Sequence, residues 1–318
     1  MKKGQILSKV REIVDADTQC GLDIYVCLDD EKQGFYLEKM VSKNCLKDKV
    51  RTIALDVIKT QYMEDDNEYC GIEDVVDNKK AIYILEQSDE YKPFAVLNEA
   101  LDNISNFDEA NIGHVLGFIF KLNFNSKKLF LYQHAYVGSK LQVKNTLRIM
   151  QKEKVFAPVE KEMLKIDKRG EIIIIDNILL VKKINVLQDY FGFQQFVRQQ
   201  AQETIDNIEK MELLEGIDLL REYQNGEKIT ISKKLMKIKN SPVLEMDKEQ
   251  LLNKIPKIPR YSKQIHIENG YIQIKSKKDV DNLLKLLNDD IVKSELTNKE
   301  YDSTAKKLLP SEKQEIRI

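Results

Sequence analysis

The 318 residues of the chain are enough for two modest domains or one elaborate one. Apolar residues make up 42% and charged residues 32%, which is typical of a charged globular protein and excludes a disordered one. No apolar run reaches the roughly 18–20 residues that span a bilayer, and the N-terminus begins an amphipathic helix pattern, unlike the apolar core of a signal peptide. We therefore expect a soluble, intracellular protein.

Charge is distributed unevenly along the chain. Residues 1–110 carry 14 Lys and Arg against 24 Asp and Glu, a net charge of −10, whereas residues 111–318 carry 37 against 28, a net charge of +9. Such an asymmetry indicates that the two parts face different partners or each other. The pattern of predicted elements changes at the same place, so we predict a domain boundary near residue 110.

The acidic part, 1–110, mixes helical and strand patterns. Apolar residues recur at helical spacing in two stretches, and alternating or β-branched runs indicate strands. Helices are expected over 5–14 and 45–63, with a further helical stretch over 93–104, and strands over 22–28, 35–41 and 81–85. A turn over 29–34 joins the first two strands into a hairpin, so this part has an α/β character.

The central segment, 113–183, is rich in β-branched and aromatic residues. Turn signals at Asn125-Ser126, Arg169-Gly170 and Asp176-Asn177 separate its apolar runs. The expected strands are 115–124, 128–137, 163–167, 171–175 and 178–182. A central antiparallel β-meander of about five strands is the simplest arrangement.

The last part of the chain is mostly helical. Apolar residues at helical spacing predict helices over 193–211, 213–223, 228–238, 278–287 and 301–308. Asn269-Gly270 joins 264–267 to 271–274 in the clearest hairpin of the chain. The predicted fold class is therefore α+β: an N-terminal α/β part, a central antiparallel β-meander, and a helical C-terminal part with a β-hairpin.

No catalytic or metal-binding signature stands out. The 12 glycines form neither a phosphate-binding loop nor a nucleophile elbow. The four cysteines, which lack a C-x-x-C pair and a nearby histidine, are Cys20, Cys27, Cys45 and Cys70. We expect reduced thiols in place of a zinc site or a disulfide. Asp65-Asp66 and Asp289-Asp290 would each need a third ligand to hold Mg²⁺, so we expect no metal and no cofactor.

Two further groups contain residue types that are used in catalysis. The three histidines, each in or beside a strand-like run, are His114, His134 and His266. A structural or surface role is expected for them before that of a general base. Asp167, Glu171 and Lys182 are the nearest approach to a nuclease-like grouping, but no acid-x-Lys triplet is present. We expect a binding protein and not an enzyme, with a metal-dependent nuclease as the alternative.

Positive charge is concentrated in two windows. Residues 121–165 hold ten basic and three acidic residues, and residues 228–278 hold thirteen basic and four acidic. Lysines neutralise DNA phosphates and release counterions, which gives affinity without sequence preference, and the low arginine content argues against reading guanine edges. The residues expected to contact DNA are Lys233, Lys234, Lys237, Lys263, Lys275, Lys277 and Lys278. Pairing between the acidic and basic parts, within or between subunits, is the alternative use of this charge.

The stretch Val280–Leu309 combines a Leu-rich helix, an acidic pair, Ser294-Glu295-Leu296-Thr297 and Tyr301. In this order, and after the Asn269-Gly270 hairpin, it resembles the C-terminal signature of the Kiwa anti-phage KwaB family, a similarity that covers roughly 80–310. The matching motif residues are Ser294, Glu295, Leu296, Thr297 and Tyr301. We expect Thr297 to N-cap a helix that buries Tyr301, with Glu300 completing a capping box.

The resemblance implies a bacterial cytosolic defence protein and supplies no catalytic residues. Relatives are expected to bind DNA without cleaving it, to self-associate, and to act with KwaA, a small membrane-embedded partner, so that phage replication and transcription are blocked. The acidic part would then dock on the partner or on a second subunit, and the basic part would contact DNA. We expect a homodimer recruited to the inner face of the cell membrane. A scaffold that bridges membrane partners without binding DNA is a third possibility.

Overall fold

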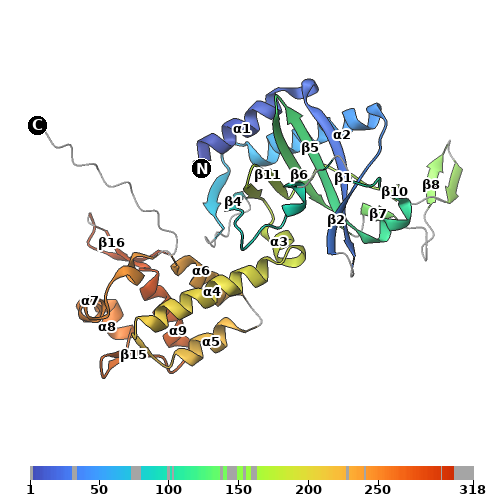
Figure 1. The fold of residues 1–318 in the computed structure, drawn as a ribbon. Coiled ribbons are helices and arrows are strands. Elements are labelled where there is room, and N and C mark those ends of the chain that lie inside the picture. The colour runs from blue at the N-terminus through green and yellow to red at the C-terminus, as the bar shows by residue number, and fades with distance from the viewer. Residues whose placement is uncertain are drawn as a thin grey trace, which may run out of the picture. The chain divides into compact units, whose positions relative to one another are not determined.

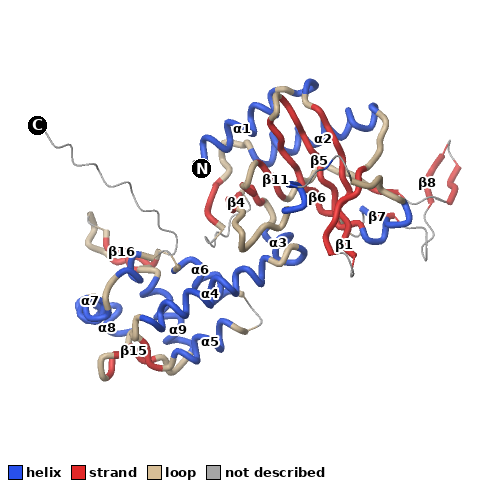
Figure 2. The backbone as a smooth tube through the Cα atoms, in the orientation of Figure 1, coloured by secondary structure: helices blue, strands red, loops and turns tan. Residues whose placement is uncertain are grey.

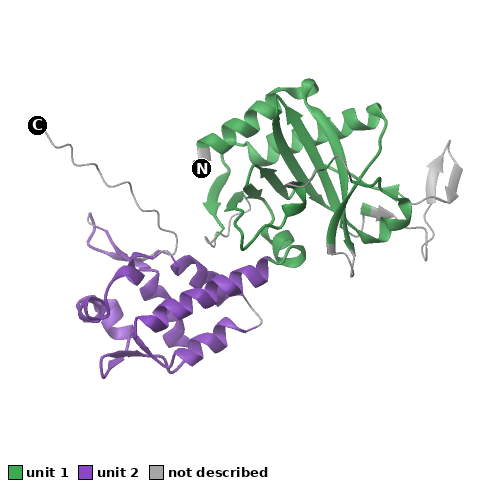
Figure 3. Cartoon of the chain, viewed as in Figure 1, with its two compact units in different colours: residues 1–72, 76–192 green, residues 73–75, 193–318 purple. Residues whose placement is uncertain are grey.

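The structure, a computed structural model, describes residues 3–30, 34–72, 80–98, 101, 104–136, 139–141, 149–152, 155–158, 163–226, 229–239, 241–294 and 296–303. The chain divides into two compact units (Figure 3). Unit 1 comprises residues 1–72 and 76–192, and unit 2 comprises residues 73–75 and 193–318. Among the described helices, none has the length and apolar content that a membrane crossing requires.

Unit 1 is built on an eight-stranded sheet with the order β2-β1-β5-β6-β11-β12-β4-β3 (Figures 1 and 2). All neighbouring strands are antiparallel except β3 and β4, which are parallel. The strands are β1 (Gly21–Asp30), β2 (Gly34–Lys39), β3 (Glu68–Gly71), β4 (Ala81–Glu86), β5 (Val115–Phe124), β6 (Lys127–His134), β11 (Ile172–Ile175) and β12 (Ile178–Val181). Smaller pairs join β7 (Lys140–Leu141) to β10 (Met163–Leu164) and β8 (Ile149–Lys152) to β9 (Val155–Pro158).

Helices α1 (Lys3–Asp15) and α2 (Asn44–Tyr62) pack on the sheet of unit 1. Their apolar stripes bury side chains such as Val10 and Ile58 against strand residues that include Leu131, in one core cluster. An aromatic group lies outside that cluster: the ring of Phe191 is 4.7 Å from Phe94 and 5.3 Å from Tyr132 between centroids. Phe191 directly follows α3 (Ile184–Tyr190). The 3₁₀ helices named in this unit are η1 (Asp17–Gln19), η2 (Ala95–Asn98) and η4 (Glu109–His114).

The predicted boundary near residue 110 falls inside this sheet. β1, which precedes it, pairs with β5, which follows it, over Gly21 to Leu28. Strands from both sides of residue 110 also share one core, so the units divide after Gly192 instead. The charge pattern changes near 110 without a change of folding unit, because charge is carried on surfaces while the division follows the buried apolar contacts.

The antiparallel meander is confirmed in shortened form. β5, β6, β11 and β12 are consecutive in the sheet and antiparallel. The expected strand over 163–167 does not belong to it, because Met163 and Leu164 pair with β7 in a separate two-stranded sheet. The meander therefore has four strands. Of the helix expected over 93–104, the described residues show the short 3₁₀ helix η2, and residues 99, 100, 102 and 103 lie outside the described part.

Unit 2 is a set of helices around one apolar core. Its helices are α4 (Phe193–Lys210), α5 (Ile217–Gln224), α6 (Thr230–Ile238), α7 (Lys248–Lys254), α8 (Pro259–Gln264) and α9 (Lys277–Leu287), with the 3₁₀ helices η6 (Pro242–Glu245) and η7 (Ile255–Lys257). A small sheet has the order β13-β15-β14, formed by Leu214–Glu215, Tyr271–Gln273 and Ile267–Glu268, and β16 (Ile291–Lys293) pairs with β17 (Glu300–Asp302). Leu235, Tyr261 and Leu283 are among the buried core residues.

The Asn269-Gly270 hairpin is confirmed. Both residues have positive φ, 51° and 77°, as the two-residue turns that match strand twist require. The helix expected over 213–223 is confirmed from Ile217 onwards as α5, whereas its start and the start of the helix expected over 301–308 were wrong. Residues 213–223 begin as strand β13 before α5, separated by Gly216, whose φ is 90° and whose Cα lies too close to the Ile274 carbonyl for a Cβ. The expected helix over 301–308 is not formed at its start, since Tyr301 belongs to β17, and residues 304–318 lie outside the described part.

Candidate functional site

The lysines predicted to contact DNA all belong to unit 2, where they form two groups. The first group, Lys233, Lys234 and Lys237, lies half-buried on α6. Burial lowers the pKa of Lys233 from its ordinary value, because desolvation disfavours the ammonium form. Lys234 places its Nζ 3.1 Å from Asp281 Oδ1 on α9. Part of the charge on α6 is therefore already used within the unit.

A small cavity separates part of α6 from α9. It has a volume of about 200 Å³, and Lys234, Lys237 and Lys285 contribute to its lining beside the apolar side chains of Ile238 and Leu284. The structure thus brings three lysines together around an apolar hollow. This hollow is small for a ligand site, because such pockets usually measure about 300–1,000 Å³.

The second group, Lys263, Lys275, Lys277 and Lys278, is exposed. Lys275 lies 3.5 Å from Glu268 across an exposed ion pair. Lys277 and Lys278 open α9, directly after Ser276, whose Oγ accepts a hydrogen bond from the Asp279 backbone N–H as the N-cap. Positive charge at a helix N-terminus opposes the helix dipole, so these two lysines are not placed to stabilise α9.

Lys263 lies near α9 through the packing of α8. The carbonyl of its neighbour Gln264 accepts a hydrogen bond from Asn282 Nδ2 at 3.1 Å, and Lys278 is one helical turn before Asn282. We call Lys263, Lys277 and Lys278 the α8–α9 lysines. Within the described residues these three form no ion pair, so their charge is open to an external anion.

The family-motif residues form the β16–β17 hairpin. Ser294 Oγ accepts from the Thr297 backbone N–H at 3.2 Å, and the Ser294 carbonyl accepts from Asn298 at 2.8 Å. These bonds build the turn, at which Leu296 is 97% exposed. Glu295 lies outside the described residues. The expected N-cap role of Thr297 was wrong, and so was the burial of Tyr301, because Tyr301 pairs with Val292 in this hairpin and is 51% exposed.

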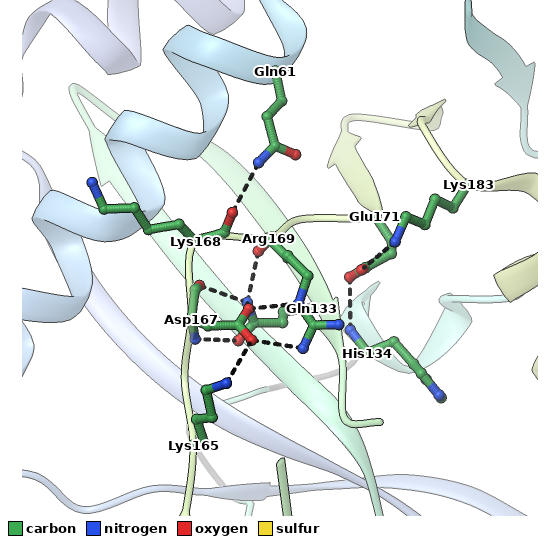
Figure 4. A network of polar contacts seen from close by, with 9 residues as sticks. All are labelled: Gln61, Gln133, His134, Lys165, Asp167, Lys168, Arg169, Glu171 and Lys183. Atoms are coloured by element: carbon green, nitrogen blue, oxygen red, sulfur yellow. Dashed lines mark hydrogen bonds and ion pairs between the residues drawn. The ribbon is translucent and has the colours of Figure 1, made fainter. Parts of the chain in front are cut away.

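A second candidate site is a polar cluster in unit 1, drawn in Figure 4. Arg169 donates to the two carboxylate oxygens of Asp167 through Nε and Nη2, both at 2.7 Å. This bidentate pair lowers the pKa of Asp167, chiefly through the hydrogen bonds. Gln133 Nε2 donates to the carbonyls of Asp167 and Arg169 at 2.7 Å each, which fixes the segment that leads into β11.

Glu171, which follows that segment, is the most deeply buried acid of the cluster, 1% exposed. Its Oε2 accepts from the His134 backbone N–H at 2.9 Å, and its Oε1 lies 3.8 Å from Lys183 Nζ. Burial raises the pKa of Glu171 despite the His134 hydrogen bond. The His134 ring is enclosed by Tyr190 and Tyr136, with centroids at 4.2 and 4.6 Å.

A larger cavity adjoins this cluster, with a volume of about 550 Å³. We call it the tyrosine–lysine cavity, after the side chains Tyr83, Tyr136, Tyr190, Lys182 and Lys183 in its lining. Tyr83 lies on β4, Tyr136 two residues after β6, Lys182 and Lys183 between β12 and α3, and Tyr190 at the end of α3. Three regions that are distant in the sequence, at residues 81–83, 136 and 182–190, therefore meet at one hollow.

Asp167, Glu171 and Lys182 do not form a nuclease-like site, because each side chain interacts with a different partner. Asp167 pairs with Arg169, Glu171 faces His134, and Lys182 donates to the carbonyl of Gln61 at 2.9 Å. In the part of the chain that the structure describes, no group of three or more His, Cys, Asp or Glu residues is arranged to hold a metal ion. The cysteines Cys20, Cys27, Cys45 and Cys70 are free thiols in the structure.

Sequence reasoning did not find the tyrosine–lysine cavity. One signal was available: Tyr132, His134 and Tyr136 alternate, so they emerge on one face of an extended segment. The alternation alone does not show that Tyr190, at the end of α3, lies against the His134 ring, because that contact joins residues far apart in the sequence.

The fold is that of an α+β protein. One unit has an eight-stranded, mainly antiparallel sheet, and the helical second unit carries the exposed lysines. Residues 112–297 match the model of the family described as Kiwa protein KwaB-like. The chain belongs to this KwaB-like family, as the motif in the β16–β17 hairpin suggested. Membership supports an anti-phage defence role in the Kiwa system.

One curated relative is the Kiwa protein KwaB of Escherichia coli O55:H7 (strain RM12579 / EPEC). It is 28% identical over 149 residues, which is 46% of this chain and 47% of the relative. The similarity thus spans about half the length of that relative. No solved structure matches the chain.

Proposed function

We propose that this protein acts in anti-phage defence by binding DNA through its phosphates, without cleaving it. The observation that carries the proposal is the exposure of the α8–α9 lysines, which have no ion pair within the described residues. Such cations bind polyanions by releasing counterions, and they do not depend on base sequence. The family supports this assignment only at the level of the defence system.

The proposal includes a small integral membrane partner, KwaA, and a homodimer. The partner would recruit the protein to the inner face of the cell membrane, where bound DNA is withheld from replication and transcription. An acidic surface within residues 1–110, with its net charge of −10, would dock on the partner or on the second subunit.

A salt series tests the DNA proposal. Affinity of the full chain for a short duplex is measured from low to physiological salt, and log affinity is expected to fall linearly with log salt. The triple variant K263Q/K277Q/K278Q should lower the slope by roughly 2.7, at about 0.9 per lost phosphate contact, and weaken binding at least about tenfold.

The matched control is K43Q/K49Q/K128Q, which removes three exposed lysines from unit 1. It is expected to bind DNA like the unaltered protein. Absence of affinity at low salt, or affinity that does not change with salt, would refute DNA binding. Linear DNA incubated with Mg²⁺ or Mn²⁺ should stay intact with shifted mobility, whereas shortened DNA would support the nuclease alternative.

A further inference from the structure

Contact with DNA phosphates on unit 2 gives no role to the tyrosine–lysine cavity of unit 1. Its volume of about 550 Å³ lies within the range of about 300–1,000 Å³ usual for small-molecule sites. Its lining combines aromatic rings with ammonium groups, and a buried carboxyl group lies directly behind it. We propose that this cavity binds a nucleoside phosphate, with the phosphate on Lys182 and Lys183 and the base against the tyrosine rings.

The two lysines bring positive charge to the lining of the cavity, one anchored and one exposed. Lys182 is anchored through its Nζ to the Gln61 carbonyl of α2 at 2.9 Å and keeps further N–H donors. The side chain of Lys183 is 52% exposed, so its ammonium is accessible. Its Nζ lies 3.8 Å from Glu171 Oε1 and 5.4 Å from the centre of the Tyr136 ring. Positive charge from these two residues complements the negative charge of a phosphate group.

The tyrosines provide the surface for a base. Tyr190 is 46% exposed, and its ring is held at one side by the His134 ring. Tyr136 is fixed by Arg169, whose guanidinium carbon lies 4.6 Å from the ring centre. Aromatic rings stack on any nucleobase, and Asn185 and Asp189 in the same lining offer a donor and acceptors to base or ribose edges.

Other ligand classes fit less well. An aromatic cage for an alkylammonium ligand uses the same rings, but two lysine ammonium groups in the lining would repel that ligand. A purely apolar ligand would displace water from the exposed ammonium group of Lys183 without replacing its hydrogen bonds, which is costly. An anion with a flat aromatic portion satisfies both kinds of side chain at once.

Calorimetric titration of the full chain tests the proposal. The ligands are AMP, GMP, CMP and UMP, together with adenosine and inorganic phosphate as partial ligands. At least one nucleotide is expected to bind more tightly than either partial ligand. K183Q should weaken that binding at least about tenfold, which is the size of one charge-assisted hydrogen bond. Y190A should weaken it as well, and Y190F should restore it, because Phe keeps the ring.

Two controls keep the test decisive. K128Q removes an exposed lysine on β6 outside the cavity and should leave nucleotide binding unchanged. K263Q/K277Q/K278Q should also leave it unchanged, and its failure to do so would move the nucleotide to the basic surface of unit 2. Circular dichroism verifies that each variant is folded, and K182Q replaces K183Q if the latter is not.

Three results would overturn the proposal. The first is that no nucleotide binds at millimolar concentration. The second is that inorganic phosphate binds as tightly as the nucleotides, which removes the role of the tyrosines. The third is equal affinity of K183Q and K128Q, which places the phosphate elsewhere.

Discussion

The two units of this chain use charged side chains in opposite ways. In unit 1, Asp167, Arg169 and Glu171 are held by defined hydrogen bonds, and Glu171 is buried. In unit 2, the α8–α9 lysines are exposed and form no ion pair within the described residues. Buried, mutually satisfied polar groups fix a local geometry, whereas exposed cations act through a field that salt screens. The first arrangement suits recognition of a small ligand, and the second suits a polyanion.

The charged side chains of the two units also differ in their effect on the free energy of unfolding. Burial disfavours the ionised form of Glu171 and raises its pKa, so unit 1 keeps this carboxylate at some expense of stability. The exposed lysines of unit 2 carry no such cost, since water solvates them. A residue that costs stability without an evident packing role is a good candidate for function.

The largest expected effect is a loss of stability confined to one of the two units. Leu131 in unit 1 and Leu283 in unit 2 are both fully buried, and replacing either with Ala should cost about 2–5 kcal/mol of unfolding free energy through lost burial and a cavity. Hydrogen exchange resolved by peptide is the measurement. L131A should speed exchange in residues 3–192 and L283A in residues 193–303, and equal acceleration of both regions by either variant would contradict two separable units.

A smaller effect is expected at the Asp167–Arg169 pair. Because the pKa of Asp167 is lowered in the fold, the pair stabilises unit 1 above the unfolded pKa of about 3.8, and this contribution is lost as pH falls through the lower folded value. R169A should therefore cost about 1 kcal/mol at pH 7, reduced by partial solvent exposure. Unfolding measured from pH 7 to 3 should show the two proteins converging in acid. A constant difference across that range would rule out the ion pair as the cause.

Glu171 should show the opposite sign. Its pKa is raised in the folded state. The carboxyl group therefore does not affect stability below the unfolded pKa, and it destabilises the fold increasingly as pH rises towards the folded pKa. E171Q should remove that pH dependence and raise the unfolding free energy at pH 7 by up to about 1 kcal/mol. Thermal unfolding at pH 4 and pH 7 measures it. Greater loss of stability at pH 7 than at pH 4 would show that the carboxylate is a stabilising group.

The smallest effect is expected on DNA affinity when the half-buried lysines of unit 2 are replaced. K233Q/K234Q/K237Q on α6 should weaken DNA binding only a few-fold, less than K263Q/K277Q/K278Q, because the α6 lysines are half-buried and Lys234 already pairs with Asp281. Parallel binding curves at one salt concentration compare the two triples. Equal or greater loss in the α6 triple would place the DNA on α6 instead.

The sequence predicted most elements and missed how they combine. Strong periodicity located α1, α2, α4, α6 and the strands of the meander to within a few residues. The C-terminal helix over 301–308 failed at its first residues because Tyr301 found a strand partner in Val292, and the pairing of two short segments is not a local property. The sequence predicts a single set of DNA-contacting lysines, but burial divides them into a half-buried group on α6 and an exposed group.

The α+β class, the family motif and the uneven charge can be read from the amino-acid order, because composition and period are properties of consecutive residues. The fold was needed to show that residues on both sides of 110 share one sheet, and that Tyr83, Tyr136, Lys183 and Tyr190 meet at one cavity. The physical reason is that sheet order and burial depend on contacts between residues far apart in the chain. A linear charge count contains no information about those contacts.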